Sequence, residues 1–350
     1  MSFIGPLSPA DSAGHAGARL DNGPLHRQRR DLVSELHRFV FDGLPVRGIL
    51  VRLTESWREV LARRARTPPP WPRPVQDLLG EMAAAGVLMH ANIKFAGDLI
   101  LQVFGDGPVK LAVAEIRADL AFRVTATVRG AVADEASLAE MLNAQGGGRC
   151  AITLAPVDRR AGQQPYQGVV PLHGDAREPL PAIAPVLEHY MLQSEQLDTR
   201  LVLAADDNVA AGLLLQRLPP PGAGVDESRI GRDEDFNRVA MLAATLTRGE
   251  LLGLDADTVL RRLFWEEKLT RFAPLVGATA PRFACTCSRA KVGAMLRGLG
   301  RAEIDDIVRE QAQVEVGCEF CGQRYRFDPV DVGELFVAPA DQAPGSNAIN

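Results

Sequence analysis

Hydrophobic positions between residues 31 and 218 follow mainly the two-residue period of β-strands. From Phe122 to Val128, apolar residues alternate strictly with arginine and threonine, which is the pattern of a half-buried strand. The segments 99–104 and 109–115 flank a Gly-Asp-Gly-Pro turn, so they are predicted to pair as a hairpin. Three further strands are predicted over 49–53, 199–205 and 209–218.

Two stretches of this region have the period of amphipathic helices. Val75, Leu78 and Met82 recur on one helical face after a proline-rich entry, and a second helix is predicted over about 180–196. Strands outnumber helices and lie in hairpins. We therefore predict an α+β core region over 29–219, with a largely antiparallel sheet and packed helices.

A Pro-Pro-Pro-Gly run from Pro219 ends the strand pattern, and a linker of different texture follows over 220–281. Two apolar helical stripes, the second beginning after a predicted cap at Asp255, face densely charged surfaces. The stripes consist of Phe236, Val239, Ala243 and Leu246, and of Val259, Leu260, Leu263 and Phe264. Such helices need a surface to cover, so we predict that they lie on the sheet of the core region. An ordinary helical subdomain and a removable cover both fit this composition.

The composition is that of a large globular protein with a mild acidic excess. At 350 residues and 46% hydrophobic content, the chain can bury a sizeable core, and we expect two or more domains. A net charge of −5 argues against nucleic acid as a partner, because phosphate neutralisation needs a basic face. The sequence shows neither a signal peptide nor a membrane span, so we expect a cytoplasmic protein with no membrane contact.

The remaining features are assigned structural roles. Residues 1–28 and 338–350 are rich in small and polar residues and are predicted to be a disordered extension and tail. Cys150, which follows three glycines in a predicted flexible turn, is expected to be a buried strand cysteine. The six histidines show no ligand spacing. The three tryptophans are predicted to be packing anchors: Trp57, Trp71 and Trp265.

Four cysteines in two tight pairs provide the most specific chemistry of the chain. Cys285-Thr-Cys287 and Cys318-Glu-Phe-Cys321 are separated by thirty residues, and Gly322 follows the second pair. Pairs of thiolates on two separate turns are typical of a tetrahedral Zn²⁺ site, and glycine suits the positive φ of such a turn. We therefore predict one Zn²⁺ per chain in a small region over 282–337. Four flanking cations are predicted to offset its negative charge: Arg282, Arg289, Lys291 and Arg324.

Other uses of the four thiols are buried packing, permanent disulfides, a purely structural metal, and a metal that keeps the thiols ready for oxidation. Ligand spacing argues against simple packing, and the absence of a secretory signal argues against permanent disulfides. Sulfurs around one Zn²⁺ lie about 3.8 Å apart, whereas a disulfide needs about 2.05 Å, so oxidation must expel the ion. A segment this small depends on its metal for folding, so a redox switch is physically available. Spacing alone does not choose between the structural and the redox use.

Several stretches resemble the redox-regulated chaperones of the heat-shock protein 33 family. The resemblance covers about 31–336, and five segments carry it: 98–116, 189–199, 212–219, 283–289 and 316–329. The extension before about residue 31 is longer than the family leads us to expect.

The resemblance implies an ATP-independent holdase and not an enzyme. It implies an inactive, zinc-bound monomer when reduced, and disulfides between Cys285 and Cys287 and between Cys318 and Cys321 when oxidised. Loss of zinc would then unfold the C-terminal region and the linker, which acts as a thermolabile sensor, and a homodimer would bind unfolding client proteins. We assign client binding to apolar residues of the linker stripes: Phe236, Val239, Leu246, Leu260, Leu263 and Phe264.

Two other functions use the same cysteines. A zinc ribbon with purely structural metal, on a nucleic-acid or protein interaction module, would show a basic surface, and the acidic balance counts against it. A thiol-disulfide oxidoreductase using Cys318 and Cys321 would place them where a helix opens, whereas here a strand-like Arg-Tyr-Arg-Phe follows. No Ser/His/Asp or paired-carboxylate constellation stands out, so no enzyme is expected.

Overall fold

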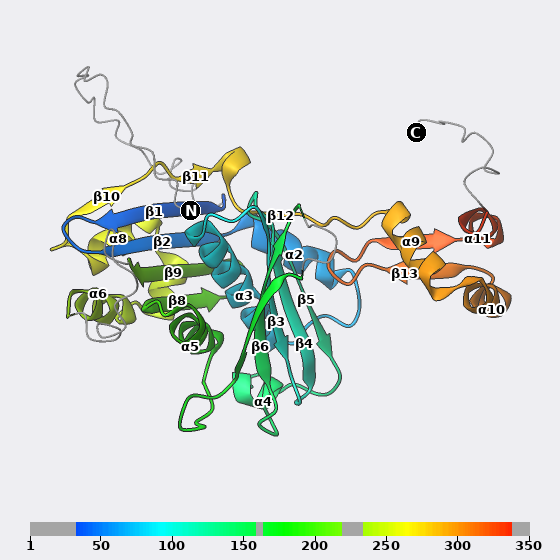
Figure 1. The fold of residues 1–350 in the computed structure, drawn as a ribbon, viewed down its shortest axis with the longest axis horizontal. Coiled ribbons are helices and arrows are strands. Elements are labelled where there is room, and N and C mark those ends of the chain that lie inside the picture. Colours follow the sequence, from blue (N-terminus) through cyan, green and yellow to red (C-terminus); the bar gives the residue numbers. More distant parts are fainter. Residues whose placement is uncertain (1–32, 159–163, 219–233, 338–350) are drawn as a thin grey trace, which may run out of the picture. The chain divides into compact units, whose positions relative to one another are not determined.

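The computed structural model describes residues 33–158, 164–218 and 234–337. The predicted extension over 1–28, the tail over 338–350 and the start of the linker lie outside the described residues. The described chain forms two six-stranded sheets and one two-stranded sheet, with helices packed on them (Figure 1). The α+β class with largely antiparallel sheets is confirmed, although the core region contains two large sheets where one was expected.

The first large sheet is antiparallel throughout, with the order β10-β1-β2-β9-β8, and β11 also pairs with β1. The predicted strands over 49–53, 199–205 and 209–218 all belong to it. Ile49 pairs with Leu214, a partner far along the chain that strand patterns alone do not identify. Its strands are β1 (Glu35–Phe41), β2 (Val46–Leu53), β8 (Thr199–Ala205), β9 (Ala210–Arg217), β10 (Leu269–Arg271) and β11 (Leu275–Val276).

The second large sheet has the order β12-β5-β4-β3-β6-β7. The predicted hairpin is confirmed by the pairing of Phe104 with Leu111, and β12 is the one parallel strand among the described pairs of this sheet. Cys150 is buried in β6, as predicted, and burial raises its thiol pKa to about 12. The strands are β3 (Gly97–Phe104), β4 (Val109–Ile116), β5 (Ala121–Val128), β6 (Arg149–Pro156), β7 (Tyr166–Pro171) and β12 (Arg282–Phe283).

Helix α3 (Arg73–Asn92) packs against strands of both large sheets and is buried along most of its length (Figure 1). Two glycines permit this close packing: a Cβ at Gly80 would overlap Ala205 of the first sheet, and one at Gly86 would overlap Ile116 of the second. The core between the sheets therefore forms around one helix. The other helices of the core region are α2 (Glu55–Ala65), α4 (Leu138–Leu142) and α5 (Ile183–Glu195), of which α5 was predicted.

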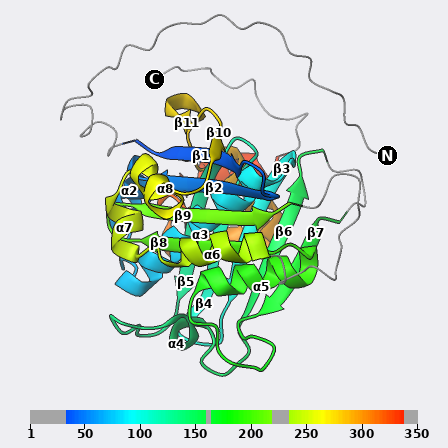
Figure 2. The same cartoon turned by 90° about the vertical axis from the view of Figure 1, so that its left-hand side faces the viewer.

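The linker helices cover the opposite face of the first sheet, as their apolar stripes predicted (Figure 2). Phe264 packs edge-on against Phe41, with ring centroids 5.0 Å apart, and the Asp255 side chain caps its helix by accepting from the Thr258 N–H. Leu246 lies beyond the end of its helix but still contributes to the cluster. The helices are α6 (Glu234–Ala244), α7 (Arg248–Gly253) and α8 (Ala256–Leu263).

Two linker predictions were wrong. The linker is not wholly helical, because Leu269–Arg271 and Leu275–Val276 form strands that pair with β1. Without them the backbone groups along this edge of β1 would lack hydrogen-bond partners. Trp265 is 74% exposed and is not a packing anchor, whereas Trp57 and Trp71 are buried. Phe264 is the buried residue at the end of α8, and Trp265 lies in the turn between α8 and β10.

Arg248 of α7 connects the linker to the core region through an acidic site. Its guanidinium pairs with Asp77 of α3 at 3.0 Å, and Arg248, Asp77, Glu81, Arg73 and the acidic pair Asp134 and Glu135 line one cavity. Burial raises the pKa of Glu81 from 4.5 to about 8; neighbouring Asp77 adds to this effect and Arg248 opposes it.

This raised pKa predicts that the folded chain loses stability as the pH rises from about 4.5 to about 8. Over that range folded Glu81 keeps a proton that the unfolded chain releases, so protonation favours the folded state at the acidic end. The variant Glu81→Gln should lack this contribution and gain stability relative to the parent at pH 8. Urea unfolding at pH 5 and pH 8 measures the difference, and parallel pH dependences of parent and variant would contradict the assignment.

The C-terminal region has a small hydrophobic cluster of its own, and its domain boundaries stay a prediction. Its elements are α9 (Arg289–Leu299), α10 (Arg301–Gln311), β13 (Val314–Gly317), β14 (Arg324–Phe327) and α11 (Pro329–Leu335), preceded by the short 3-10 helix η2 (Gly277–Thr279). The buried cluster consists of Leu296, Ile304, Val314, Phe327 and Val332. Among the described helices, none is both long and apolar enough to cross a membrane.

Candidate metal centre

Cys285 and Cys287 lie in the irregular segment between β12 and α9. The pairing of Phe283 with Phe122 of β5 fixes the chain just before them, and the Ser288 side chain caps α9 just after them. Both cysteines are therefore held between two anchored points, in a segment without regular structure, as predicted.

Cys318 and Cys321 lie in the turn that joins β13 to β14. The Gly322 N–H donates to the Cys318 carbonyl at 2.8 Å, and the Cys318 N–H donates to the Gln323 carbonyl at 2.8 Å. Gly322 has a φ of +73°, as predicted, and Thr67 of the core region lies where its Cβ would be. The backbone conformation thus favours glycine, and a Cβ here would also crowd the Thr67 hydroxyl.

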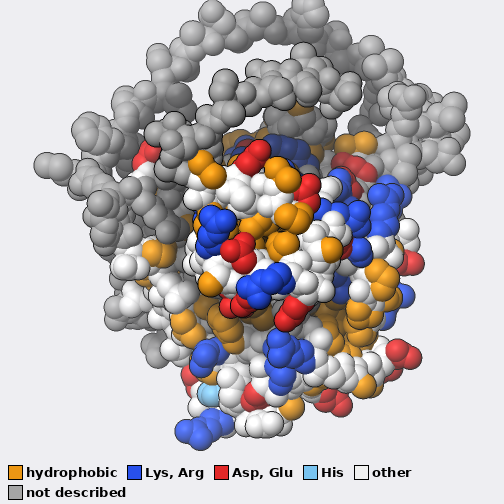
Figure 3. Space-filling view, turned by 90° about the vertical axis from the view of Figure 1, so that its right-hand side faces the viewer, with side chains coloured by type: hydrophobic (Ala, Val, Ile, Leu, Met, Phe, Trp, Pro, Cys, Tyr) orange, Lys and Arg blue, Asp and Glu red, His pale blue; other side chains and the backbone are white. Residues whose placement is uncertain are grey.

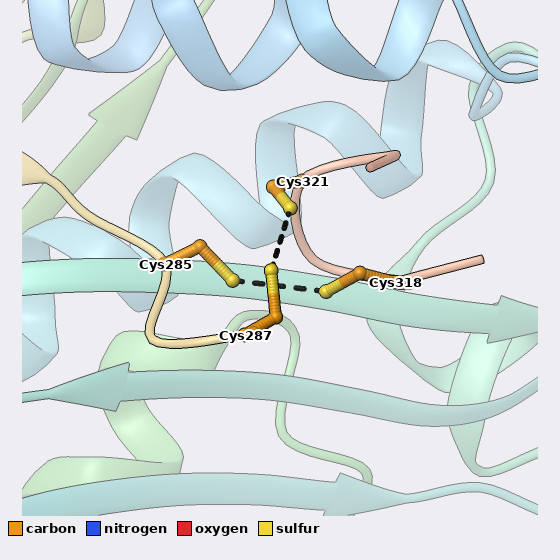
Figure 4. A group of neighbouring side chains, drawn as sticks. All are labelled: Cys285, Cys287, Cys318 and Cys321. Carbon is orange, nitrogen blue, oxygen red and sulfur yellow. Dashed lines mark hydrogen bonds between the residues drawn. The ribbon is translucent and has the colours of Figure 1, made fainter. Parts of the chain in front are cut away.

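The four sulfur atoms point toward one another from these two segments (Figure 4). The Sγ atoms of Cys285 and Cys318 are 3.7 Å apart, and those of Cys287 and Cys321 are 3.3 Å apart. All four lie within 4.8 Å of one another, and all are free thiols. Sulfurs bound to one tetrahedral Zn²⁺ lie about 3.8 Å apart, so these residues fit a single ion of that kind.

The surroundings of the thiols give them different pKa values. Burial alone would raise the pKa of Cys285, but hydrogen bonds from Cys287 and from Arg123 outweigh it and lower the pKa to about 7. Burial raises the pKa of Cys318 and Cys321. The Tyr325 hydroxyl donates to Cys287 Sγ at 3.1 Å. A metal ion would therefore have to displace protons from the buried thiols when it binds.

Most of the cations predicted to offset the thiolates form ion pairs with carboxylates. Arg282 pairs with Asp119, Arg289 with Asp331 and Arg324 with Glu315, so that prediction was wrong for these three. The backbone N–H of Lys291 donates to Ser288 Oγ, which caps α9.

A cation from the core region approaches the sulfurs instead. Arg123 of β5 donates to Cys285 Sγ at 3.7 Å, although it occupies a position that strand alternation assigns to the polar face. Arg63 of α2 lies over the Phe283 ring, with Cζ 5.1 Å from the centroid. Nothing in the periodicity of β5 distinguishes Arg123 from a solvent-facing arginine, so sequence reasoning missed it.

The six client-binding candidates are not brought together with the cysteines. All six are at most 6% exposed, and they lie in the cluster between the linker and the outer face of the first sheet. In this structure a client could reach them only after the linker leaves the sheet.

The chain is similar in sequence to known proteins over most of its length. The family model described as Hsp33 protein matches residues 34–328. The 33 kDa chaperonin of Chromobacterium violaceum is 46% identical over 313 residues, which are 88% of this chain and 97% of that protein. The 33 kDa chaperonin of Neisseria meningitidis serogroup A is 43% identical over 301 residues, 85% of this chain and 90% of that protein.

A solved structure has the same fold. The 33 kDa chaperonin of Thermotoga maritima, a heat shock protein 33 homologue, is matched with a TM-score of 0.65 at 21% identity, over 86% of this chain and 97% of that one. Together, the fold, the four-cysteine cluster and these relatives define a chaperone. More narrowly, the chain belongs to the Hsp33 family.

Proposed function

We propose that the chain is a redox-regulated, ATP-independent holdase, inactive when reduced and zinc-bound. The observation that carries this proposal is the convergence of four free sulfurs at zinc spacing in a region whose own buried cluster has only five residues. A region so small depends on its metal to stay folded. The state of the thiols therefore controls whether the C-terminal region is folded.

Cys285, Cys287, Cys318 and Cys321 would hold the ion. Bound Zn²⁺ supplies charge that keeps all four sulfurs as thiolates, which are the form that oxidants attack. Oxidation of each pair removes two electrons from two thiolates and joins their sulfurs. Peroxide accepts those electrons and, with two protons, leaves as two molecules of water. Two peroxides thus convert four thiolates into two disulfides, and no ligand set remains.

The linker provides the second half of the switch. Cys285 follows β12 after one residue, and β12, β11 and β10 attach the end of the linker to the two large sheets. Unfolding of the C-terminal region would remove the folded structure that follows these short strands. The strands would then detach more easily, and the packing of the helices α6, α7 and α8 on the first sheet would weaken. The six buried residues of the linker stripes, together with the sheet face beneath them, would then be available to unfolding clients.

We extend the proposal to assembly and location. The reduced form is expected to be a monomer and the oxidised form a homodimer that holds unfolding proteins, without nucleic-acid or membrane partners. The cytoplasm keeps thiols reduced, so it is the compartment in which such a switch starts from its resting state.

The alternative is a zinc ribbon whose metal is purely structural. On the face drawn in Figure 3, lysine and arginine side chains of the described residues are interspersed with acidic ones, which does not favour a nucleic-acid surface. The Cys318–Cys321 turn joins two strands and does not open a helix, which counts against an oxidoreductase.

A light-scattering assay tests the holdase proposal. Reduced chain and chain treated with peroxide at raised temperature are each added, without ATP, to a protein that aggregates on heating. The oxidised form should suppress scattering and the reduced form should not. Equal scattering with both forms would leave only the structural-zinc alternative.

The disulfide pattern gives a separate prediction. We expect Cys285 joined to Cys287, and Cys318 joined to Cys321, in peptides of the oxidised chain analysed by mass spectrometry. The competing products are clear, because the sulfur contacts in the structure run between the pairs, from Cys285 to Cys318 and from Cys287 to Cys321. Peptides linked across the pairs would show that the proposed pairing is wrong.

A further inference from the structure

Arg123 is the point at which the core region contacts both cysteine segments. Its guanidinium donates a hydrogen bond to Cys285 Sγ at 3.7 Å and lies over the Phe320 ring, with Cζ 4.1 Å from the centroid. Cys285 belongs to the first pair, and Phe320 lies between the two cysteines of the second. One side chain therefore touches both halves of the site.

The neighbouring strand holds Arg123 in place for this contact. Glu115 of β4 lies directly opposite Arg123 in the sheet register, and its Oε2 accepts from Arg123 Nε at 2.7 Å. Arg123 Nη2 lies 2.5 Å from the same oxygen. The side chain is 21% exposed. Because the guanidinium is oriented by the core region itself, its direction does not depend on the cysteines.

A second residue on the same face of β5 fixes the turn of the second pair. Thr125, which is 7% exposed, donates from Oγ1 to the Glu319 carbonyl at 3.1 Å. The Thr67 hydroxyl lies 2.6 Å from the position that a Cβ at Gly322 would take. Thus β5 and the chain after α2 together form the surface on which the C-x-x-C turn rests.

We infer that Arg123 is a positioning residue that ties retention of the metal to docking of the C-terminal region on β5. This inference deepens the proposed function and rests on it. Four thiolates around one dication carry two net negative charges, and Arg123 would offset part of that charge at Cys285.

The coupling must act in both directions, because linked equilibria are reciprocal. If docking on Arg123 stabilises the loaded site, then loss of the metal weakens docking, and both contacts of the guanidinium are lost together. The core region would in this way sense whether the cysteines are loaded. The position that supplies this sensing lies about 160 residues before the cysteines, outside both motifs.

The test compares three full-length variants loaded with Zn²⁺ in competition with a chromogenic chelator. Arg123→Gln should lose zinc about 10-fold more readily, because outer-shell partners are worth about 10–100-fold in metal affinity. Arg123→Lys should fall between, since it keeps the charge but not the planar fork that stacks on Phe320. Arg324→Gln is the matched control: it removes a cation that pairs with Glu315 inside the C-terminal region, and should resemble the parent.

A spectroscopic readout separates this role from general destabilisation. In the Co²⁺-loaded chain, loss of the hydrogen bond to Cys285 should move the sulfur-to-cobalt charge-transfer band to longer wavelength in Arg123→Gln and leave it in place in Arg324→Gln. If Arg123→Gln does not fold, the same comparison is made with Arg123→Lys, whose weaker hydrogen bond should give a smaller shift.

The outcomes distinguish failure of the inference about Arg123 from failure of the proposed holdase function. A parent chain that takes up no Co²⁺ with four thiolates would refute the metal site and the proposed function together. A parent that loads normally, with Arg123→Gln matching it in zinc retention and in band position, would overturn the inference about Arg123 alone. Equal losses in Arg123→Gln and Arg324→Gln would also overturn it, by showing an unspecific charge effect.

Discussion

Cys318→Ser is expected to abolish tight zinc binding and to unfold the C-terminal region while the core region stays folded. The substitution removes one of the four sulfurs that converge in this site. A hydroxyl is a poor ligand for Zn²⁺, so affinity should fall more than about 100-fold, beyond the loss caused by outer-shell changes. Structural zinc contributes about 10–16 kcal/mol in small zinc-finger peptides, and five buried hydrophobic residues cannot replace it. Chelator titration and hydrogen exchange over 282–337 measure both effects.

The fifth cysteine provides the matched control. Cys150 is fully buried in β6 and takes no part in the cluster, so Cys150→Ala should keep one zinc per chain. If Cys318→Ser retained full affinity, the four-thiolate assignment would be wrong. If Cys150→Ala lost zinc as well, the metal would not belong to this cluster alone.

Val239→Asp is expected to detach the linker and to make the chain a chaperone without oxidant. Val239 of α6 is fully buried between the linker and the first sheet. An unpaired charge at such a position costs about 3–5 kcal/mol, which a short amphipathic helix cannot recover elsewhere on the surface. Suppression of client aggregation by the reduced, zinc-loaded variant measures the effect.

The same helix offers a control on its outer side. Met241 is 66% exposed, so Met241→Asp introduces the same charge without burying it. This variant should stay inactive until oxidised. If neither substitution activates the reduced chain, the linker does not act as the cover. If both do, added charge and not detachment is the cause.

Periodicity predicted the local structure well where each element has one buried face. The strand over 199–205, the cap at Asp255 and the positive φ of Gly322 follow from short-range rules, and the structure has each of them. These features depend on residues only a few positions apart, so the sequence contains the information directly.

Long-range partners could not be predicted in the same way. The pairing of β2 with β9 joins strands from the two ends of the core region in one sheet, and no local pattern specifies it. The contact between Arg123 and Cys285 joins residues far apart in the chain, and a polar strand position looks the same whether it faces solvent or a sulfur. The four cysteines were recognisable because ligand spacing is itself local, whereas the cation beside them was not.

The most direct test of the account oxidises the chain in steps with peroxide at raised temperature. Released zinc and client light scattering are read from the same samples, without ATP. We predict that suppression of aggregation rises in proportion to zinc released and is complete at one zinc per chain. Complete release of zinc with aggregation unchanged would contradict the account.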